Sequence, residues 1–228
     1  MGEPAATPRT HKAMRAESDG RIIAAAIEAF ADRGYHRTTL GQIGKAAGYS
    51  GPLISRRYGS KAGLARVVFA HILQRLTPLG TDPTDREAWV DESVSARRQL
   101  DGFIRSYLRD AAEEPTRLRA LYVLIGEALG GMDEIDDEVA HVNRVFREHI
   151  ASYVALGQQQ HEFRADLDPA RTAVVIVGAL RGVVTQVLAE PADHDPTRLI
   201  DELRRHLVVP LLRDPQNENT DLEGDIDV

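Results

Sequence analysis

Cysteine is absent from the 228-residue chain, and aromatic residues make up only 5% of it. Without cysteine the protein has no disulfide scaffold, no thiolate metal site and no cysteine nucleophile. The 11 prolines and 18 glycines are too few for a low-complexity chain, and the hydrophobic fraction of 43% is too high for a disordered one. The composition therefore predicts a globular protein of one large domain or two small ones.

Long hydrophobic runs are also missing. The longest strongly apolar stretch, Ala173–Leu180, is followed by Arg181 and is far shorter than the roughly 20 residues that cross a bilayer. The first fifteen residues contain no apolar run of the kind found in secretory signals. We therefore expect a soluble, cytoplasmic protein with no membrane partner.

Acidic residues are absent between Arg33 and Thr77, a segment that contains eight Lys and Arg residues when Arg33 is counted. Residues 1–77 carry 12 basic and 5 acidic residues, whereas the rest of the chain carries 16 basic and 30 acidic ones. A basic end on an acidic body is typical of proteins that bind a polyanion, most often nucleic acid. Chance clustering of charge on a solvated face is the alternative interpretation.

Helical periodicity runs through almost the whole chain, and no segment alternates as a strand does. In residues 20–33, for example, Ile22, Ala26 and Phe30 recur at the spacing of one helix face. The sequence predicts an all-α fold of about nine helices, over residues 20–33, 39–47, 50–58, 61–76, 91–113, 116–129, 136–160, 168–189 and 197–213. Ser18 or Asp19 is the expected cap of the first helix.

Composition shifts divide the chain into four parts. We expect a flexible N-terminal arm over residues 1–17, a DNA-binding domain over residues 18–60, a larger helical domain over residues 61–213 and an acidic, disordered tail over residues 214–228. Residues 77–90 are interpreted as a linker because prolines and glycine interrupt them. Pro210 should distort the last turn of the ninth helix by removing a hydrogen bond to His206.

Two short helices with clear capping signals lie between residues 39 and 58. Thr39 and Gln42 form a capping-box pattern, and Ser50 precedes a helix with Pro52 in its first turn. The small residues 46–48 allow the two helices to meet closely at a steep angle, which is the helix-turn-helix pattern. The second helix suits a major groove about 12 Å wide, provided that residues 50–58 are exposed. A helical hairpin within an ordinary bundle is the alternative.

The same region resembles the DNA-binding domain of TetR-family transcriptional regulators. The resemblance rests on Arg21, Ile22, Ile23, Ala26, Phe30, Gly34, Tyr35, Thr38, Thr39, Ile43, Ala47, Gly48, Ser50, Tyr58, Lys61 and Leu64, which stand at the spacing of the family's motif. The segment Phe163–Pro169, followed by Gly178 and Gly182, resembles the start of the family's eighth helix. Ser55 departs from the family's usual tyrosine, and Gly44 replaces a frequent alanine.

This resemblance implies a sequence-specific DNA-binding regulator, most often a repressor that a small-molecule effector releases from a palindromic operator. The implied DNA-binding residues are Thr39, Gln42, Tyr49, Ser50, Gly51, Pro52, Ser55, Arg56, Arg57, Tyr58 and Lys61. Gly51, Pro52, Ser55 and Arg56 are expected to face the groove, while Thr39, Gln42, Tyr49, Tyr58 and Lys61 are expected to hold the DNA backbone. Phe30, Leu40, Ile43 and Leu64 are expected to form the small core beneath.

The predicted eighth helix is apolar nearly all round, so it must be buried on most sides. It could be buried against the ninth helix of the same chain, which is the alternative to pairing between chains. The resemblance implies that these helices form a homodimer interface, as twofold-related operator half-sites require. The interface residues expected from it are Val177, Gly178, Arg181, Gly182, Leu203 and Leu207.

The helices between residues 61 and 160 hold a small apolar or amphipathic ligand in members of that family. The candidate lining residues are Trp89, Phe103, Tyr107, Tyr122, Ile125, His141 and Val145. Ordinary core packing is the alternative for each of them.

Signatures of catalysis are missing from the sequence. No two of the eight histidines are three or four residues apart, and no glycine-rich phosphate loop or Gly-x-Ser-x-Gly turn is present. We therefore predict no catalytic residue, no metal ligand and no cofactor. An enzyme, or a ligand-binding or scaffolding bundle that has lost DNA binding, remains the alternative to a regulator.

Overall fold

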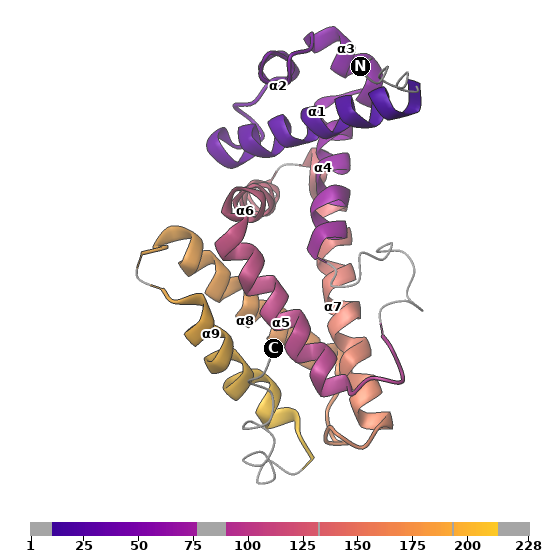
Figure 1. Ribbon diagram of the computed structural model, residues 1–228, viewed down its shortest axis with the longest axis vertical. Helices are drawn as coiled ribbons and strands as arrows, with labels where there is room; N and C mark the ends of the chain where they lie inside the picture. The colour runs from indigo at the N-terminus through magenta and orange to yellow at the C-terminus, as the bar shows by residue number, and fades with distance from the viewer. Residues whose placement is uncertain (1–10, 77–89, 132, 193, 214–228) are drawn as a thin grey trace, which may run out of the picture. The chain divides into compact units, whose positions relative to one another are not determined.

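The computed structural model describes residues 11–76, 90–131, 133–192 and 194–213. Over these residues the chain forms nine α-helices and no strand (Figure 1), which confirms the predicted all-α fold. The helices are α1 (His11–Arg33), α2 (Leu40–Ala47), α3 (Gly51–Tyr58), α4 (Lys61–Leu76), α5 (Ala96–Glu113), α6 (Pro115–Leu129), α7 (Asp136–Gln159), α8 (Pro169–Ala189) and α9 (Pro196–Leu203). The first ten residues, residues 77–89 of the expected linker and the acidic tail 214–228 lie outside the described residues.

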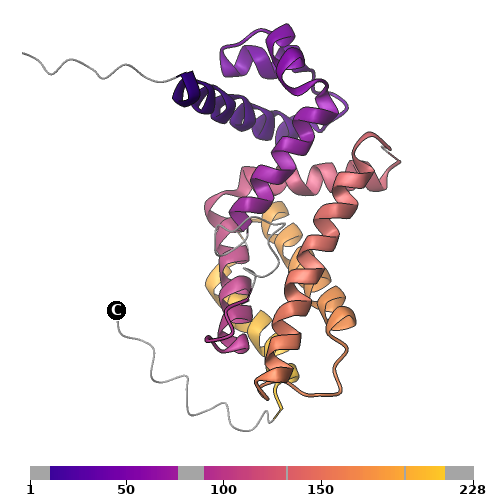
Figure 2. The same ribbon diagram turned by 90° about the vertical axis from the view of Figure 1, so that its right-hand side faces the viewer.

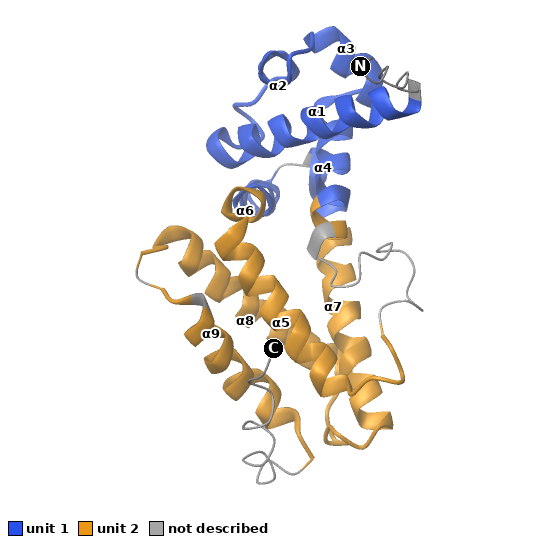
Figure 3. Cartoon of the chain, viewed as in Figure 1, with its two compact units in different colours: residues 1–71, 119–139 blue, residues 72–118, 140–228 orange. Residues whose placement is uncertain are grey.

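Two compact units make up the chain (Figure 3). The first, here called the head, comprises Met1–His71 and Arg119–Val139, and the second, here called the body, comprises Ile72–Leu118 and Ala140–Val228. The head therefore includes a distant segment, from α6 and the start of α7, in addition to the predicted DNA-binding domain. Local periodicity could not reveal this, because it carries no information about which remote helix joins a unit.

The first helix begins earlier than predicted. It starts at His11, not near Gly20, and forms the long rod seen in Figures 1 and 2. Residues 11–17 favour this extension because they are mostly strong helix formers, such as Lys, Ala, Met, Arg and Glu. The hydroxyl of Ser18 donates to the carbonyl oxygen of Arg15 at 2.8 Å, so Ser18 lies inside the helix and is not its cap.

Apolar side chains from α1 to α4 form the core of the head. Phe30, Ile43 and Leu64, three of the four residues predicted for this core, are fully buried, and Leu40 is half-buried. Ile54 of α3 is also fully buried. This core holds the two eight-residue helices α2 and α3, which by themselves are too short to be stable in water.

The body is centred on aromatic side chains. Phe103 and Tyr107 of α5 stack with their ring centroids 6.1 Å apart, and Phe146, His149 and Tyr153 of α7 surround Phe103 at 5.4–6.2 Å. We call these five residues the aromatic cluster. Helix α5 also contacts α8 and α9, which flank it in Figure 1.

Helix α8 has one face in the body core and one face open. Among the described helices it alone is long and apolar enough to cross a membrane by length and composition. Ile176, Leu180 and Val184 are nevertheless at most 2% exposed, as expected of a core helix. On the other face Val174 and Val175 are 55% and 65% exposed.

The segment after α9 departs from α-helical geometry, as Pro210 predicts. Residues Arg204–Val208 form a π-helical segment, and Val209–Leu211 form a 3₁₀ turn. The proline nitrogen has no hydrogen to donate to His206, so the α-helical ladder cannot continue there. The predicted distortion is confirmed, but it begins at Arg204, two residues before the His206 carbonyl to which Pro210 cannot donate.

Candidate nucleic-acid interface

The joint between α2 and α3 is fixed by capping and by a close approach of backbone. The capping box is formed: the backbone amide of Gln42 donates to Thr39 Oγ1 at 3.2 Å, and the backbone amide of Thr39 donates to Gln42 Oε1 at 2.8 Å. Gly48 ends α2 in the left-handed conformation, with φ of +79°. A Cβ atom on Gly44 would lie 2.8 Å from the carbonyl oxygen of Tyr49. Glycine at position 44 therefore lets the two helices meet closely.

Helix α3 presents most of its surface to solvent. Ser50 caps it by accepting a hydrogen bond from the Leu53 amide at 3.3 Å. Ile54 is its only buried residue, whereas Pro52, Ser55 and Arg56 are exposed. Residues 50–58 are therefore accessible, as DNA binding requires, because only Ile54 is buried in the core of the head.

The exposed surface of the two helices is basic. Arg56 and Lys45 are exposed, and neither side chain has an ion-pair or hydrogen-bond partner among the residues that the structure describes. Ser55 makes only a long contact, of 3.5 Å, from its hydroxyl to the carbonyl oxygen of Gly59. Side chains without internal partners are available to a polyanion.

Arg57 and Tyr58, at the end of α3, are instead turned toward α1. Arg57 Nη1 donates to Ser18 Oγ at 2.7 Å and to Asp19 Oδ1 at 2.9 Å, and the Tyr58 hydroxyl donates to the same carboxylate oxygen at 2.8 Å. Burial, followed by the hydrogen bond to Asp19, raises the pKa of Tyr58 to about 12. Asp19 thus anchors the end of the predicted recognition helix.

Tyr49 and Lys61 also have partners within the head. Arg21 donates a hydrogen bond to the Tyr49 hydroxyl and lies over its ring. Lys61 Nζ donates to the carbonyl oxygens of Tyr35 and Thr38, at 2.8 and 3.0 Å. An ammonium group has three donors, so Lys61 retains one of them for a DNA phosphate.

Tyr35, in the loop after α1, is held from several sides. Its amide donates to Glu127 Oε2 at 2.5 Å, and its hydroxyl donates to Glu134 Oε2 at 2.6 Å. Burial and the hydrogen bond to Glu134 raise the pKa of this tyrosine. Lys61 lies 4.1 Å from the centre of its ring. These contacts tie the residues from α6 and the following turn to the first part of the head.

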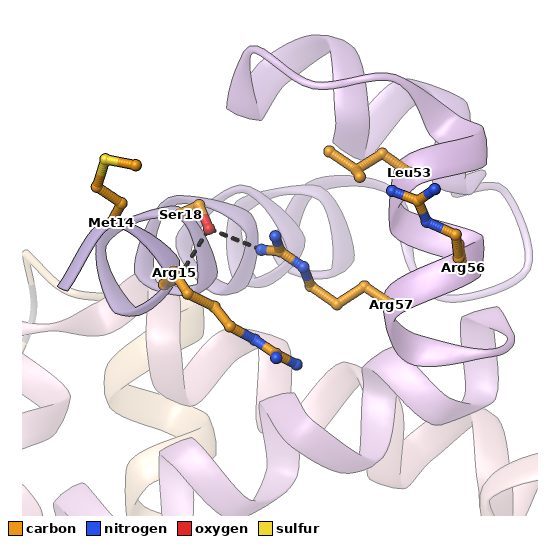
Figure 4. Close-up of a pocket in the computed structure, with 6 residues that line it drawn as sticks. All are labelled: Met14, Arg15, Ser18, Leu53, Arg56 and Arg57. Atoms are coloured by element: carbon orange, nitrogen blue, oxygen red, sulfur yellow. Dashed lines mark hydrogen bonds between the residues drawn. The ribbon is translucent and has the colours of Figure 1, made fainter. Parts of the chain in front are cut away.

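A cleft of about 600 Å³ lies between the first turns of α1 and the outer face of α3 (Figure 4). Its lining residues are Met14, Arg15, Ser18, Leu53, Arg56 and Arg57. The side chain of Arg15 is 72% exposed, and its Nε atom lies 4.0 Å from Asp19 Oδ2. The cleft was not predicted from sequence, because it depends on the early start of α1.

The predicted ligand-lining residues separate into different environments. Phe103 and Tyr107 belong to the aromatic cluster, and Val145 is buried in the body. Ile125 is buried and Tyr122 half-buried in α6 of the head. Trp89 lies outside the described residues.

His141, another residue predicted to line the ligand site, does not belong to the buried core of the body. It is exposed on α7, with its Nδ1 3.4 Å from the guanidinium of Arg144. The periodic pattern of α7 could not decide its orientation, because position 141 adjoins the buried stripe that contains Val142 and Val145. The aromatic residues that do face the core from α7 are Phe146, His149 and Tyr153.

The predicted dimer-interface residues also differ in exposure. Gly178 and Gly182 are exposed on α8, and no heavy atom lies within 4 Å of a Cβ placed on either. Val177 and Leu203, by contrast, are 6% and 7% exposed, so both side chains are buried within their own chain. Leu207 is half-buried in the π-helical segment.

Arg181 has an unusual environment for a dimer-interface candidate. It donates a hydrogen bond to Asn143 and lies over the ring of Phe146. Its Nε and Nη2 atoms are buried without a hydrogen-bond partner among the described residues. A buried guanidinium that is only partly satisfied costs free energy.

Comparison with known proteins supports a regulator. Residues 22–68 match the model of the bacterial regulatory proteins of the tetR family, and residues 96–209 match the model of the C-terminal domain of BetI-type transcriptional repressors. An uncharacterized HTH-type transcriptional regulator of Mycobacterium tuberculosis is 36% identical over 89 residues, which cover 39% of this chain and 47% of the relative. The transcriptional activator FasR of Mycolicibacterium smegmatis is 32% identical over 112 residues, 49% of this chain and 40% of the relative. The matched region thus spans about half the length of these curated relatives.

Solved structures share the fold. FadR of Bacillus subtilis, crystallised in complex with stearoyl-CoA, superposes with a TM-score of 0.71 at 19% identity over 83% of this chain and 97% of the other. NalD of Pseudomonas aeruginosa, the secondary repressor of the MexAB-OprM efflux pump, superposes with a TM-score of 0.67 at 20% identity over 88% and 99% of the two chains. The two family models and the exposed, capped helix-turn-helix agree, and the chain belongs to the TetR family of helix-turn-helix transcriptional regulators.

Proposed function

We propose that this protein is a repressor that binds a palindromic DNA operator as a homodimer and leaves it when a small-molecule effector binds. The observation that carries the proposal is the exposure of α3, which buries only Ile54 and leaves Pro52, Ser55 and Arg56 free to enter a major groove. Gly51 lies at the start of this surface. The match to the C-terminal domain of BetI-type repressors favours repression. Such a regulator acts by binding alone, in the cytoplasm where the operator is.

Helix α8 supports the homodimer. Its open face carries Val174, Val175, Gly178 and Gly182, an apolar and flat surface on which a second copy of the helix fits closely. Light scattering should give about twice the 25.1 kDa of the chain. Val175→Arg should yield monomers, whereas Val94→Arg, at an exposed valine before α5, should not. A wild-type monomer would contradict the homodimer.

Two observations support an effector site in the body. The aromatic cluster and Val145 provide apolar surface there, and the structural neighbour FadR was crystallised with stearoyl-CoA. A ligand releases DNA only if it binds the DNA-free conformation more tightly than the DNA-bound one.

Selection of DNA bound by the purified protein from sheared genomic fragments tests the proposal. The expected result is enrichment of a twofold-symmetric sequence with half-site centres about 34–36 Å apart. Candidate effectors are then screened by their ability to release that duplex. Failure to enrich any sequence would contradict a sequence-specific regulator.

A further inference from the structure

Three arginines converge on the cleft between α1 and α3. Arg15 comes from the second turn of α1, and Arg56 and Arg57 come from the last turn of α3 (Figure 4). Met14 and Leu53 supply apolar walls, and Ser18 completes the lining. None of the lining residues is acidic, so the cleft is a basic hollow and not an ordinary gap between two helices.

One carboxylate faces these three guanidinium groups. Asp19 Oδ1 is engaged by Arg57 at 2.9 Å and by the Tyr58 hydroxyl, and its Oδ2 lies 4.0 Å from Arg15 Nε. Arg56 has no partner among the described residues. The other charged residues of these turns, Lys12 and Glu17, are exposed and do not line the cleft. Two positive charges therefore remain without a compensating acid.

We propose that this cleft binds a phosphate of the DNA backbone, next to the groove that α3 enters. This inference rests on the function proposed above. Arg15 and Arg56 would donate to the phosphate oxygens, since a guanidinium presents paired donors that suit a phosphate. Arg57, held by Ser18 and Asp19, is a positioning residue that fixes the distance between α3 and α1.

This phosphate site lies partly outside the region that the chain shares with the family. The matched segment begins at residue 22, whereas Met14, Arg15 and Ser18 precede it. The site exists because α1 starts at His11 and carries these residues alongside α3. The first turns of α1 thus extend the basic surface of the helix-turn-helix by one contact that carries no base information.

Salt titrations of DNA binding test the proposal. Affinity is measured by fluorescence anisotropy between about 0.05 and 0.2 M NaCl, on the selected operator and on an unrelated duplex of equal length. Arg15→Gln should weaken binding to both duplexes about tenfold, the size of one charge-assisted hydrogen bond, and should reduce the slope of log K against log salt by about 0.9. Arg15→Lys should keep most of the slope, because it retains the charge.

Arg33→Gln is the matched control, with the same charge change at the other end of α1. Arg33 is exposed and pairs with Asp32, away from the cleft, so the slope should not change. Equal losses of DNA affinity in Arg15→Gln and Arg33→Gln would mean that the effect comes from net charge alone, and would overturn the proposal. An unchanged slope in Arg15→Gln would also overturn it. Circular dichroism should show that both variants keep their helix content.

Two further outcomes separate this inference from the proposed function. Replacing chloride by inorganic phosphate at constant ionic strength should weaken binding by the wild type more than binding by Arg15→Gln, because free phosphate competes for the same guanidinium groups. Equal effects on the wild type and on Arg15→Gln would contradict a phosphate site at Arg15. A wild type that binds duplexes without preference would refute the proposed operator, while the change of slope on the unrelated duplex would still decide whether Arg15 contacts phosphate. A wild type that binds no duplex would refute both.

Discussion

The head and the body each have an apolar core, but they differ in the contacts that position their elements. In the head, hydrogen bonds join residues from separate elements: Asp19 holds the end of α3, and Lys61 and Glu127 hold the loop at Tyr35. In the body, five aromatic residues of α5 and α7 pack together. Hydrogen bonds are directional whereas apolar burial is not, so the head can fix the orientation of a short helix that buries one residue.

The contrast has a consequence for substitutions. A buried aromatic side chain contributes several kcal/mol, whereas one hydrogen bond contributes about 1 kcal/mol net. Changes in the body should therefore act mainly on stability. Changes in the head should cost less stability and disturb DNA binding more.

The largest loss of stability is expected for Phe103→Ala. Phe103 is 2% exposed and touches four other aromatic rings, and truncating such a residue costs about 3–5 kcal/mol. Chemical denaturation monitored by circular dichroism measures this. Leu129→Ala, at a residue 81% exposed, is the control and should change stability by less than about 0.5 kcal/mol. A similar small cost for Phe103→Ala would mean that the aromatic cluster does not hold the body together.

Gly44→Val should act on the head by forcing α2 and α3 apart. A Cβ at this position would meet backbone atoms of residues 49–51 at 2.8–3.1 Å, and overpacking of this kind costs about 1–3 kcal/mol. We expect operator binding to be lost even where the protein remains folded. Gly41→Ala, where the nearest atom would be 3.8 Å away, should retain the joint. Full operator affinity in Gly44→Val would contradict the close approach.

A smaller change of stability, about 1 kcal/mol, is expected for Asp19→Asn. The substitution removes the charge that Arg57 and Tyr58 share and so loosens the end of α3. Hydrogen exchange should detect faster opening of the amides of residues 55–59, while the body amides remain protected. Uniform changes across both units would show that the head does not depend on this anchor.

The smallest effect is a pH dependence at alkaline pH. Because the folded head raises the pKa of Tyr58 from 10.0 to about 12, the neutral hydroxyl contributes stability that is complete below pH 10 and is lost as the pH rises towards 12. Tyr58→Phe lacks this contribution, so the difference in stability between wild type and variant should shrink over that interval. A constant difference from pH 8 to 12 would contradict the raised pKa of Tyr58, which burial and then the hydrogen bond to Asp19 produce.

The sequence predicted the ends of several helices correctly, because these ends depend on local signals. The capping box of Thr39 and Gln42 and the cap at Ser50 are local signals, and each correctly predicted where its helix begins. The predicted start of the eighth helix at residue 168 also agrees with the structure, in which Asp168 caps α8. Local propensity also explains the early start of α1, because residues 11–17 extend it past the capping residues expected at its start.

Contacts between remote elements could not be predicted in this way. Nothing near Arg57 or Tyr58 in the sequence indicates Asp19 as their partner, and nothing near Tyr35 indicates Glu127. From side-chain identity, the sequence therefore predicted that Arg57, Tyr58 and Lys61 contact DNA. In the structure these three side chains are at least partly engaged in hydrogen bonds within the head. In the body, the sequence predicted that α8 is buried on most sides, whereas Val174 and Val175 are exposed on one face of it.

The absence of cysteine allows a direct test of the central claim, that the exposed face of α3 contacts DNA. Ser55→Cys introduces the only thiol of the chain on that face, and Ala112→Cys introduces one on the exposed surface of α5 as a control. Alkylation of both thiols should be fast in the free protein. The selected operator should slow alkylation at position 55 and leave the rate at position 112 unchanged. Equal rates at position 55 with and without bound operator would contradict it.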